Sequence, residues 1–139
     1  MPGKTIEELH VGDTASRVKI VSQEDILSFA RVTGDLNPIH VDDRAAAESI
    51  FGRRVAHGML VGSLFSPIFG LELPGEGCIY MGQELKFLKP VYPGDEITAT
   101  VTVTGLIPEK NRALFDTVAV NQHGEKVVSG TATLYPRKR

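Results

Sequence analysis

The feature that most limits the possible folds is the order of the hydrophobic segments: one long apolar helix pattern comes before four strand patterns in a row. Residues 57–73 read HGMLVGSLFSPIFGLEL, which predicts a buried central helix, with Pro67 and Gly70 as candidates for a kink or an end. The strand patterns cover residues 78–89, 96–107, 113–122 and 126–136. Consecutive strands after a buried helix indicate an α+β domain in which a curled antiparallel sheet packs on that helix.

The segment before this helix predicts a strand followed by a capped helix. Residues 14–21 mix β-branched and polar residues with partial alternation, as a short strand does. Ser22 is a good N-cap, and Gly34 can end the next helix in the left-handed conformation that glycine adopts without strain. A second, alanine-rich helix is expected over residues 43–49, so residues 35–40 form a loop between two helices.

Length and composition fit one folded domain that spans residues 1–139. The formal net charge is −2 at pH 7, and 42% of the residues are hydrophobic, which excludes a disordered chain. A nearly neutral balance offers no broad basic surface to nucleic acid, apart from weak contacts that the C-terminal PRKR sequence can make.

The cysteine content and the lack of long apolar runs predict a cytoplasmic protein without a membrane partner. Cys78 has no second cysteine for an internal disulfide, and the sequence holds no Cys/His cluster with zinc spacing. No run approaches the roughly 20 apolar residues of a membrane span. The first residues also lack the apolar core of a signal peptide.

The loop DLNPIH brings a carboxylate and an imidazole close together in the sequence. Pro38 stiffens this loop because it fixes its own φ and restricts Asn37 to extended geometry. Asp35 and His40 are candidates for proton transfer. Taken as isolated residues, Asp35 and Asn37 are equally well explained as turn formers that satisfy their own backbone, with His40 at the surface.

The start of the apolar helix is the second place of interest. His57 and Gly58 open this helix, whose first turn leaves N–H groups unpaired, and a residue without a side chain lets a ligand oxygen come close. Close helix packing explains the glycine equally well. Ser63 and Ser66 are expected to bond back to the preceding turn, and neither stands in the G-x-S-x-G motif of a serine hydrolase.

Together and in order, these pieces resemble one family. The strings GDLNPIH, AHGMLVGSLFS and YPGDEI are similar to those of the MaoC-like (R)-specific enoyl-CoA hydratases and related 3-hydroxyacyl-thioester dehydratases. The similarity extends from about Gly12 to Tyr135. It implies a hot-dog fold, in which a long sheet wraps around a central helix, and assembly into homodimers or larger oligomers.

The resemblance also implies roles for residues in these motifs. The catalytic aspartate and histidine of the family match Asp35 and His40, and the amide that contacts the thioester oxygen matches that of Gly58. Asn37 matches the asparagine of the motif, which we expect to support the loop. Ser66 falls where the family helix carries a serine that lines the site.

The implied reaction is hydration of a trans-2-enoyl thioester to an (R)-3-hydroxyacyl thioester, together with the reverse dehydration. We expect Asp35 to take a proton from water and His40 to position that water and deliver a proton to C2. The Gly58 N–H then stabilises the enolate by binding the thioester oxygen. This chemistry needs no cofactor.

Charged residues offer contacts for a carrier but do not require a metal. The phosphates of coenzyme A or of an acyl-carrier-protein arm can meet Arg53, Arg54, Lys86 and Lys89. Solvated surface charge is the simpler explanation of each. Asp42 and Asp43 follow His40 as in a metal cluster, but an aspartate at position 42 is more typical of a helix cap.

Acyl chain length and two other functions stay open. Phe69 and Leu134, if they point into the acyl tunnel, limit its depth and favour short acyl groups. A hot-dog thioesterase also uses a carboxylate and a helix-end oxyanion contact, but its loop does not need His40. A noncatalytic acyl-thioester-binding subunit keeps the pocket and has no need of Asp35 and His40.

Overall fold

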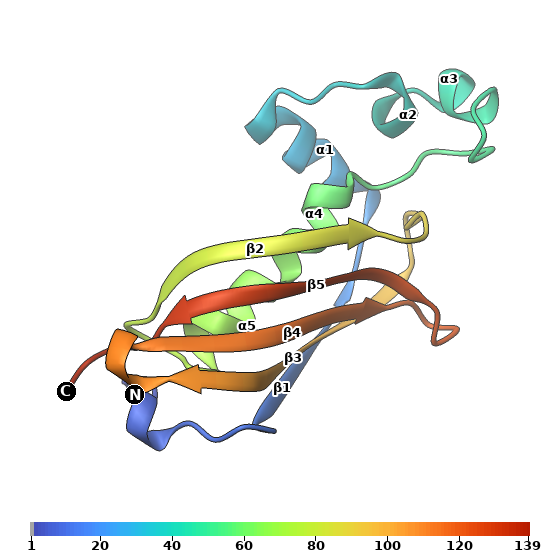
Figure 1. The fold of residues 1–139 in the computed structure, drawn as a ribbon. Coiled ribbons are helices and arrows are strands. Elements are labelled where there is room, and N and C mark those ends of the chain that lie inside the picture. The colour runs from blue at the N-terminus through green and yellow to red at the C-terminus, as the bar shows by residue number, and fades with distance from the viewer. Residues whose placement is uncertain (1) are drawn as a thin grey trace.

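The computed structural model describes residues 2–139, which form one five-stranded antiparallel sheet with helices against one face and beyond one edge (Figure 1). The strand order is β1-β3-β4-β5-β2. The strands are β1 (Thr14–Ile20), β2 (Ile79–Phe87), β3 (Glu96–Ile107), β4 (Arg112–Val120) and β5 (Lys126–Tyr135). The α-helices are α1 (Gln23–Thr33), α2 (Pro38–Val41), α3 (Asp43–Ala47), α4 (Gly58–Gly62) and α5 (Ser66–Leu71), and the 3-10 helices are η1 (Ile6–Glu8), η2 (Ser63–Phe65) and η3 (Pro108–Lys110).

Alternating burial explains why β3 and β4 form the middle of the sheet. Each strand buries every second side chain on the face toward η2 and α5, and the residues between them are partly exposed. Phe115 of β4 is fully buried in the same cluster as Phe65 and Ile68 of the central helices. All five predicted strands are confirmed, and the sheet has one face on the core and one toward solvent.

The central helix is not the single buried helix that residues 57–73 predict. It runs as α4, η2 and α5, and Pro67 lies in the first turn of α5, where its missing N–H leaves no hydrogen bond unmade. Its surface is not apolar and buried all round, because Met59 is 59% and Leu71 66% exposed. Within residues 2–139, no helix is long and apolar enough to cross a membrane.

Residues 22–57, here called the overhang, follow β1 and carry α1, α2 and α3, which lie above the edge strand β2 in the view of Figure 1. Ser22 and Asp25 form a capping box at the start of α1, and Gly34 ends this helix with a φ of 81°, as predicted. The predicted loop over residues 35–40 is wrong at its C-terminal end. Pro38 begins α2, so His40 lies on a helix.

Candidate active site

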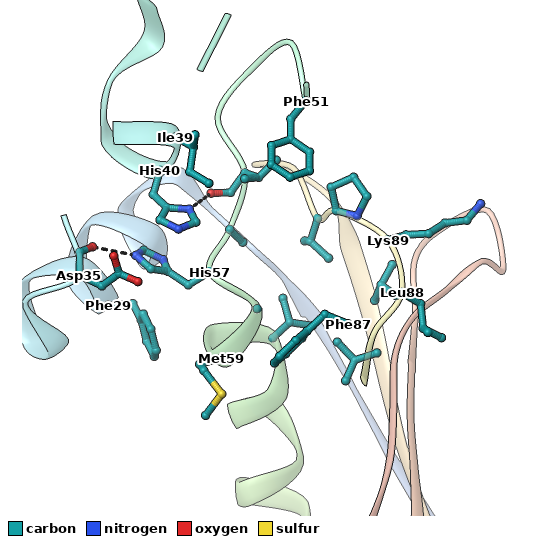
Figure 2. A pocket seen from close by; sticks show the side chains of 18 of the residues that line it. Phe29, Asp35, Ile39, His40, Phe51, His57, Met59, Phe87, Leu88 and Lys89 are labelled. Atoms are coloured by element: carbon teal, nitrogen blue, oxygen red, sulfur yellow. Dashed lines mark hydrogen bonds between the residues drawn. The ribbon is translucent and has the colours of Figure 1, made fainter. Parts of the chain in front are cut away.

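A cavity of about 670 Å³ lies where the overhang meets the start of α4 and the segment that follows β2. Figure 2 shows Asp35, His40, His57 and Phe29 along one wall, whereas Phe87, Leu88 and Lys89 approach from the opposite wall. The lining is mostly apolar and consists of Phe29, Thr33, Asp35, Ile39, His40, Phe51, Val55, Ala56, His57, Gly58, Met59, Val61, Phe87, Leu88, Lys89, Pro90, Val91, Val127 and Val128. The polar side chains of the overhang therefore face an apolar pocket.

His40 is held rigidly at this cavity with one ring nitrogen committed to the backbone. Its side chain is buried, and Nδ1 lies 2.7 Å from the carbonyl oxygen of Val55 (Figure 2). Because a carbonyl only accepts, Nδ1 carries the hydrogen. Nε2 is then the nitrogen of His40 that is left for proton transfer.

Asp35 follows the left-handed Gly34 and shapes the next turn. Its N–H donates to Thr33 Oγ1 at 3.1 Å, and its Oδ1 accepts from the Asn37 N–H at 3.2 Å. The turn-forming interpretation of Asp35 is therefore correct as far as it goes. The same carboxylate also lines the cavity, so its local hydrogen bond orients a group that faces a ligand.

The second histidine, His57, joins the two side chains. Its Nε2 lies 3.0 Å from the backbone oxygen of Asp35, and its ring stacks on that of His40 with centroids 3.8 Å apart. One carboxylate oxygen of Asp35 and one ring nitrogen from each histidine lie within 4.8 Å of one another. The loop that carries Asp35, helix α2 and the start of α4 therefore meet at this site.

This trio has the residue types of a metal site but not the arrangement of one. His40 Nδ1 and His57 Nε2 both face backbone carbonyls, so neither can bind an ion. The stacked rings are nearly parallel, at 24°, so their nitrogen lone pairs do not converge. The remaining nitrogen, His57 Nδ1, is buried. Only the Asp35 carboxylate and His40 Nε2 of this trio remain as possible metal ligands, fewer than the three or four protein ligands of a zinc site.

The start of α4 presents free backbone N–H groups to the cavity. His57 is the N-cap of α4, but its side chain makes no capping hydrogen bond. In the part of the chain that the structure describes, no acceptor is hydrogen-bonded to the N–H of Gly58 or Met59. Gly58 lines the cavity, and the absence of a side chain leaves room for Phe87, whose Cδ1 lies 2.7 Å from where a Cβ would stand.

Comparison with known proteins places these features in a family. Residues 8–128 match the family described as "MaoC like domain". The chain belongs to this family. An (R)-specific enoyl-CoA hydratase of Rhodospirillum rubrum is 45% identical over 128 residues, which cover 92% of this chain and 88% of the relative. A mitochondrial 3-hydroxyacyl-[acyl-carrier-protein] dehydratase of Arabidopsis thaliana is 41% identical over 128 residues, 90% of this chain and 76% of that protein.

The solved structures agree with this assignment. The unliganded R-hydratase PhaJ1 from Pseudomonas aeruginosa superposes with a TM-score of 0.92 at 39% identity, and the match covers 99% of this chain and 88% of that chain. The hot-dog fold predicted from the sequence is thus confirmed.

The structure brings three of the seven residues singled out in the sequence to the cavity of this MaoC-like chain: Asp35, His40 and Gly58. Asn37 lies outside the lining and caps α2, where its Oδ1 accepts from the Ile39 N–H at 3.4 Å. This placement agrees with a supporting role for the loop, and that role stays a prediction.

The other three lie away from this cavity. Ser66 is exposed at the start of α5, and of the two helix serines only Ser63 bonds back, to the Leu60 carbonyl at 2.6 Å, among residues 2–139. Leu134 is fully buried, and Phe69 packs edge-on against Phe115 and Tyr80. Their contact with substrate therefore stays a prediction that the cavity of a single chain does not support.

The four basic residues differ in whether an ion pair with a carboxylate already engages them. Arg54 is paired with Asp43 at 2.7 Å, and Lys89 with Glu125. Arg53 lies over the Tyr92 ring, 4.0 Å from its centroid, and Lys86 is exposed with no ion pair to another described residue. The aspartate before Asp43 does cap α3, as expected: Asp42 Oδ1 accepts from the N–H groups of two residues of that helix.

Sequence reasoning assigned no role to several residues of the cavity. Phe29, Met59 and Phe87 line it, and the sequence predicts His57 only as part of a helix start. The spacing of Gly58 and Gly62 was an available signal, because both lie against β2 side chains and mark where that strand approaches α4.

Proposed function

We propose that this protein is an (R)-specific enoyl-CoA hydratase that adds water to trans-2-enoyl thioesters and catalyses the reverse dehydration. The observation that carries the proposal is the meeting of the Asp35 carboxylate, His40 Nε2 and the Gly58 N–H at one apolar cavity. Two relatives of that name, 45% and 42% identical over 92% of the chain, support the same reaction.

The geometry suggests how the proton moves. Asp35 takes a proton from water while the water oxygen adds to C3. His40, which enters this step with a hydrogen on each ring nitrogen, keeps the one on Nδ1 and gives the one on Nε2 to C2. One carboxylate oxygen of Asp35 and one ring nitrogen of His40 lie within 4.8 Å, a gap that one bridging water can span. The proton held by Asp35 can return to His40 through that water and restore the starting state. Negative charge develops on the thioester oxygen, where the free N–H of Gly58 stabilises it.

Coenzyme A is the carrier that we propose. The Rhodospirillum relative is named for an enoyl-CoA substrate, whereas the Arabidopsis relative is named for an acyl-carrier-protein substrate. Lys86 and Arg53 are available to carrier phosphates because neither is engaged in an ion pair with a described residue. Comparing rates on crotonyl-CoA and on crotonyl-carrier protein tests this choice.

We also propose a preference for short acyl groups. The aromatic side chains of Phe29 and Phe87 and the thioether of Met59 occupy the cavity wall near the catalytic groups, and Phe69 and Leu134 fill the core beneath the sheet. The measurement is turnover of crotonyl and dodecenoyl thioesters, and equal rates on both would contradict the preference.

A homodimer is the assembly that we propose, formed through the edge strand β2. An unpaired sheet edge invites pairing with a second copy. β2 also exposes large apolar side chains at Ile79, Met81 and Phe87. Light scattering on a size-exclusion column measures the mass, and a monomer at micromolar concentration would contradict this assembly.

A cytoplasmic location is proposed as well. It is supported by cysteine usage: Cys78 is the single cysteine and is free, so the chain has no internal disulfide of the kind that oxidising compartments favour. Cell fractionation tests it.

One assay separates the proposed reaction from its rivals. Hydration of crotonyl-CoA removes the enoyl absorbance without releasing thiol, and chiral analysis of the product should give the (R) alcohol. Release of free coenzyme A would instead show a thioesterase, and binding without turnover would show a noncatalytic subunit.

A further inference from the structure

His57 is the buried titratable group that the proposed reaction leaves without a task. Its side chain is 3% exposed, so it is not a surface residue at the helix start. Its Nδ1 is buried and has no hydrogen-bond partner among residues 2–139, and its Nε2 points at the Asp35 backbone oxygen. A buried polar atom without a partner is costly, so the structure must gain from keeping this ring in place.

We propose that His57 is a positioning residue that holds Asp35 and His40 in register for the reaction, an inference that rests on the proposed function. Its first contact is with the loop. Because the Asp35 carbonyl can only accept, Nε2 of His57 carries the hydrogen and ties the loop to the start of α4. This bond acts on the residue whose carboxylate faces the cavity.

Its second contact is with the other catalytic group. The ring of His57 stacks on that of His40, with centroids 3.8 Å apart, and packs against the ring of Phe29, with centroids 4.9 Å apart (Figure 2). The His57 ring therefore lies between His40 and Phe29 and supports the His40 ring. His40 is therefore fixed by two contacts, the stack and the Val55 carbonyl. Turning Nε2 away from its present position would break the stack, the Val55 hydrogen bond or both.

The arrangement requires His57 to stay neutral. With Nε2–H donated to the carbonyl, a charged ring would also bury an Nδ1–H that has no acceptor. A second positive ring at 3.8 Å would repel His40 each time His40 holds a proton. A neutral ring instead offers a π face that attracts a cation. The titratable groups that face His57 are His40 from α2 and Asp35 from the loop.

His57 is also the residue directly before Gly58. Its backbone begins α4, so one residue connects the N–H that binds the thioester oxygen to the two groups that move protons. A displacement of about 1 Å at such groups costs about 10²-fold in rate.

Three substitutions separate the two contacts. His57→Phe keeps a ring to stack on His40 but loses the N–H, and His57→Gln keeps an N–H donor but loses the ring. His57→Ala removes both. We expect kcat on crotonyl-CoA to fall about 10²-fold in the alanine variant and by less in the other two, with KM changed by less than about twofold. Folded variants whose kcat stays within about twofold of native would overturn the proposal.

A matched control excludes a general loss of stability. Ile68→Val removes one buried methylene from α5, outside the cavity, and should lower thermal stability without changing kcat. If kcat falls as much in this control as in His57→Ala, the positioning role is wrong.

A second readout does not depend on activity. Nitrogen-15 NMR of the native protein distinguishes imidazole tautomers, and we expect His57 to be neutral with its hydrogen on Nε2. A charged ring or an Nδ1–H tautomer would overturn the proposal. If native protein fails to hydrate crotonyl-CoA, the proposed function fails, whereas these spectra still test the geometry of His57.

Discussion

The overhang and the sheet-and-helix unit, residues 14–20 and 58–135, are stabilised in different ways. The sheet-and-helix unit buries alternate apolar side chains of its strands against Phe65 and Phe69. The overhang buries mostly small or polar side chains, Ile26 being the largest apolar one, and side chains cap all three of its helices. The difference teaches that the two proton-transfer groups, Asp35 and His40, lie in the part whose helices are set by local hydrogen bonds. The sheet-and-helix unit supplies the Gly58 N–H, much of the apolar wall and the larger apolar core.

The largest expected effect on stability is in the sheet-and-helix unit. Phe115→Ala empties a fully buried site in contact with Phe69, and we expect it to lower the free energy of unfolding by about 3–5 kcal/mol. Urea denaturation measures this loss, and Phe115→Leu should cost less. A loss below about 1 kcal/mol would mean that this cluster does not dominate stability.

A second substitution tests the contact between β2 and β5. A Cβ on Gly130 would stand 1.8 Å from the backbone oxygen of Glu84, so Gly130→Ala must push the strands apart, at a cost of about 1–3 kcal/mol. Gly82→Ala on β2 is the matched control, because nothing lies within 4 Å of its Cβ position. Equal stability of the two variants by urea denaturation would contradict this close approach.

In the overhang, the expected losses of stability are smaller and depend on pH. Ser22→Ala removes the N-cap of α1 and should cost about 1 kcal/mol. The Ser22 N–H, together with Lys19, holds the pKa of the Asp25 carboxyl below its usual value. Because the folded pKa is depressed, this contribution is present above about pH 4 and is lost as the pH falls through the folded pKa.

The variant Asp25→Asn measures that contribution. Its free energy of unfolding should fall less than that of the native chain when the pH is lowered from neutral into the acid range. Parallel acid curves for the two proteins would show that the capping box does not stabilise α1 through its charge.

The smallest expected effect concerns Tyr80, at the junction of β2 and the core. Burial raises its pKa to about 12, from 10.0. Because the folded pKa is raised, stability is unaffected below about pH 10 and falls as the pH rises toward 12. Tyr80→Phe also loses the hydrogen bond that the phenol donates to Gln83 Oε1, so the change with pH is the quantity compared: between neutral pH and about pH 11 the variant should lose less stability than the native chain. An identical loss in both proteins would contradict the raised pKa of this phenol, which belongs to a residue that is 36% exposed.

Local signals predicted most of the fold. The alternation of apolar and polar residues predicted β3 with the bounds that the structure shows, and Ser22 and Gly34 correctly marked the ends of α1. Four-residue α2 was missed because it is too short for a periodic pattern and depends on Pro38 and on the cap from Asn37. The change from α4 to a 3-10 turn likewise has no clear signal in an apolar run.

The candidate site could be predicted only in part, for a physical reason. Asp35 and His40 are close in sequence, so one motif suggested both. The stacking of His57 on His40 is a contact between separate elements, and no local spacing encodes it. In the same way, only the packed sheet shows that Phe69 and Leu134 lie in the core rather than along this cavity.

The most direct test of the division between the two regions is a paired measurement on Asp35→Asn. The substitution keeps Oδ1, which accepts from the Asn37 N–H, and removes the charge that takes the proton. We expect kcat/KM on crotonyl-CoA to fall by about 10²–10⁴-fold, while the free energy of unfolding changes by less than about 0.5 kcal/mol. Native-like hydration by the folded variant, or an activity loss matched by an equal loss of stability, would contradict the role of the overhang.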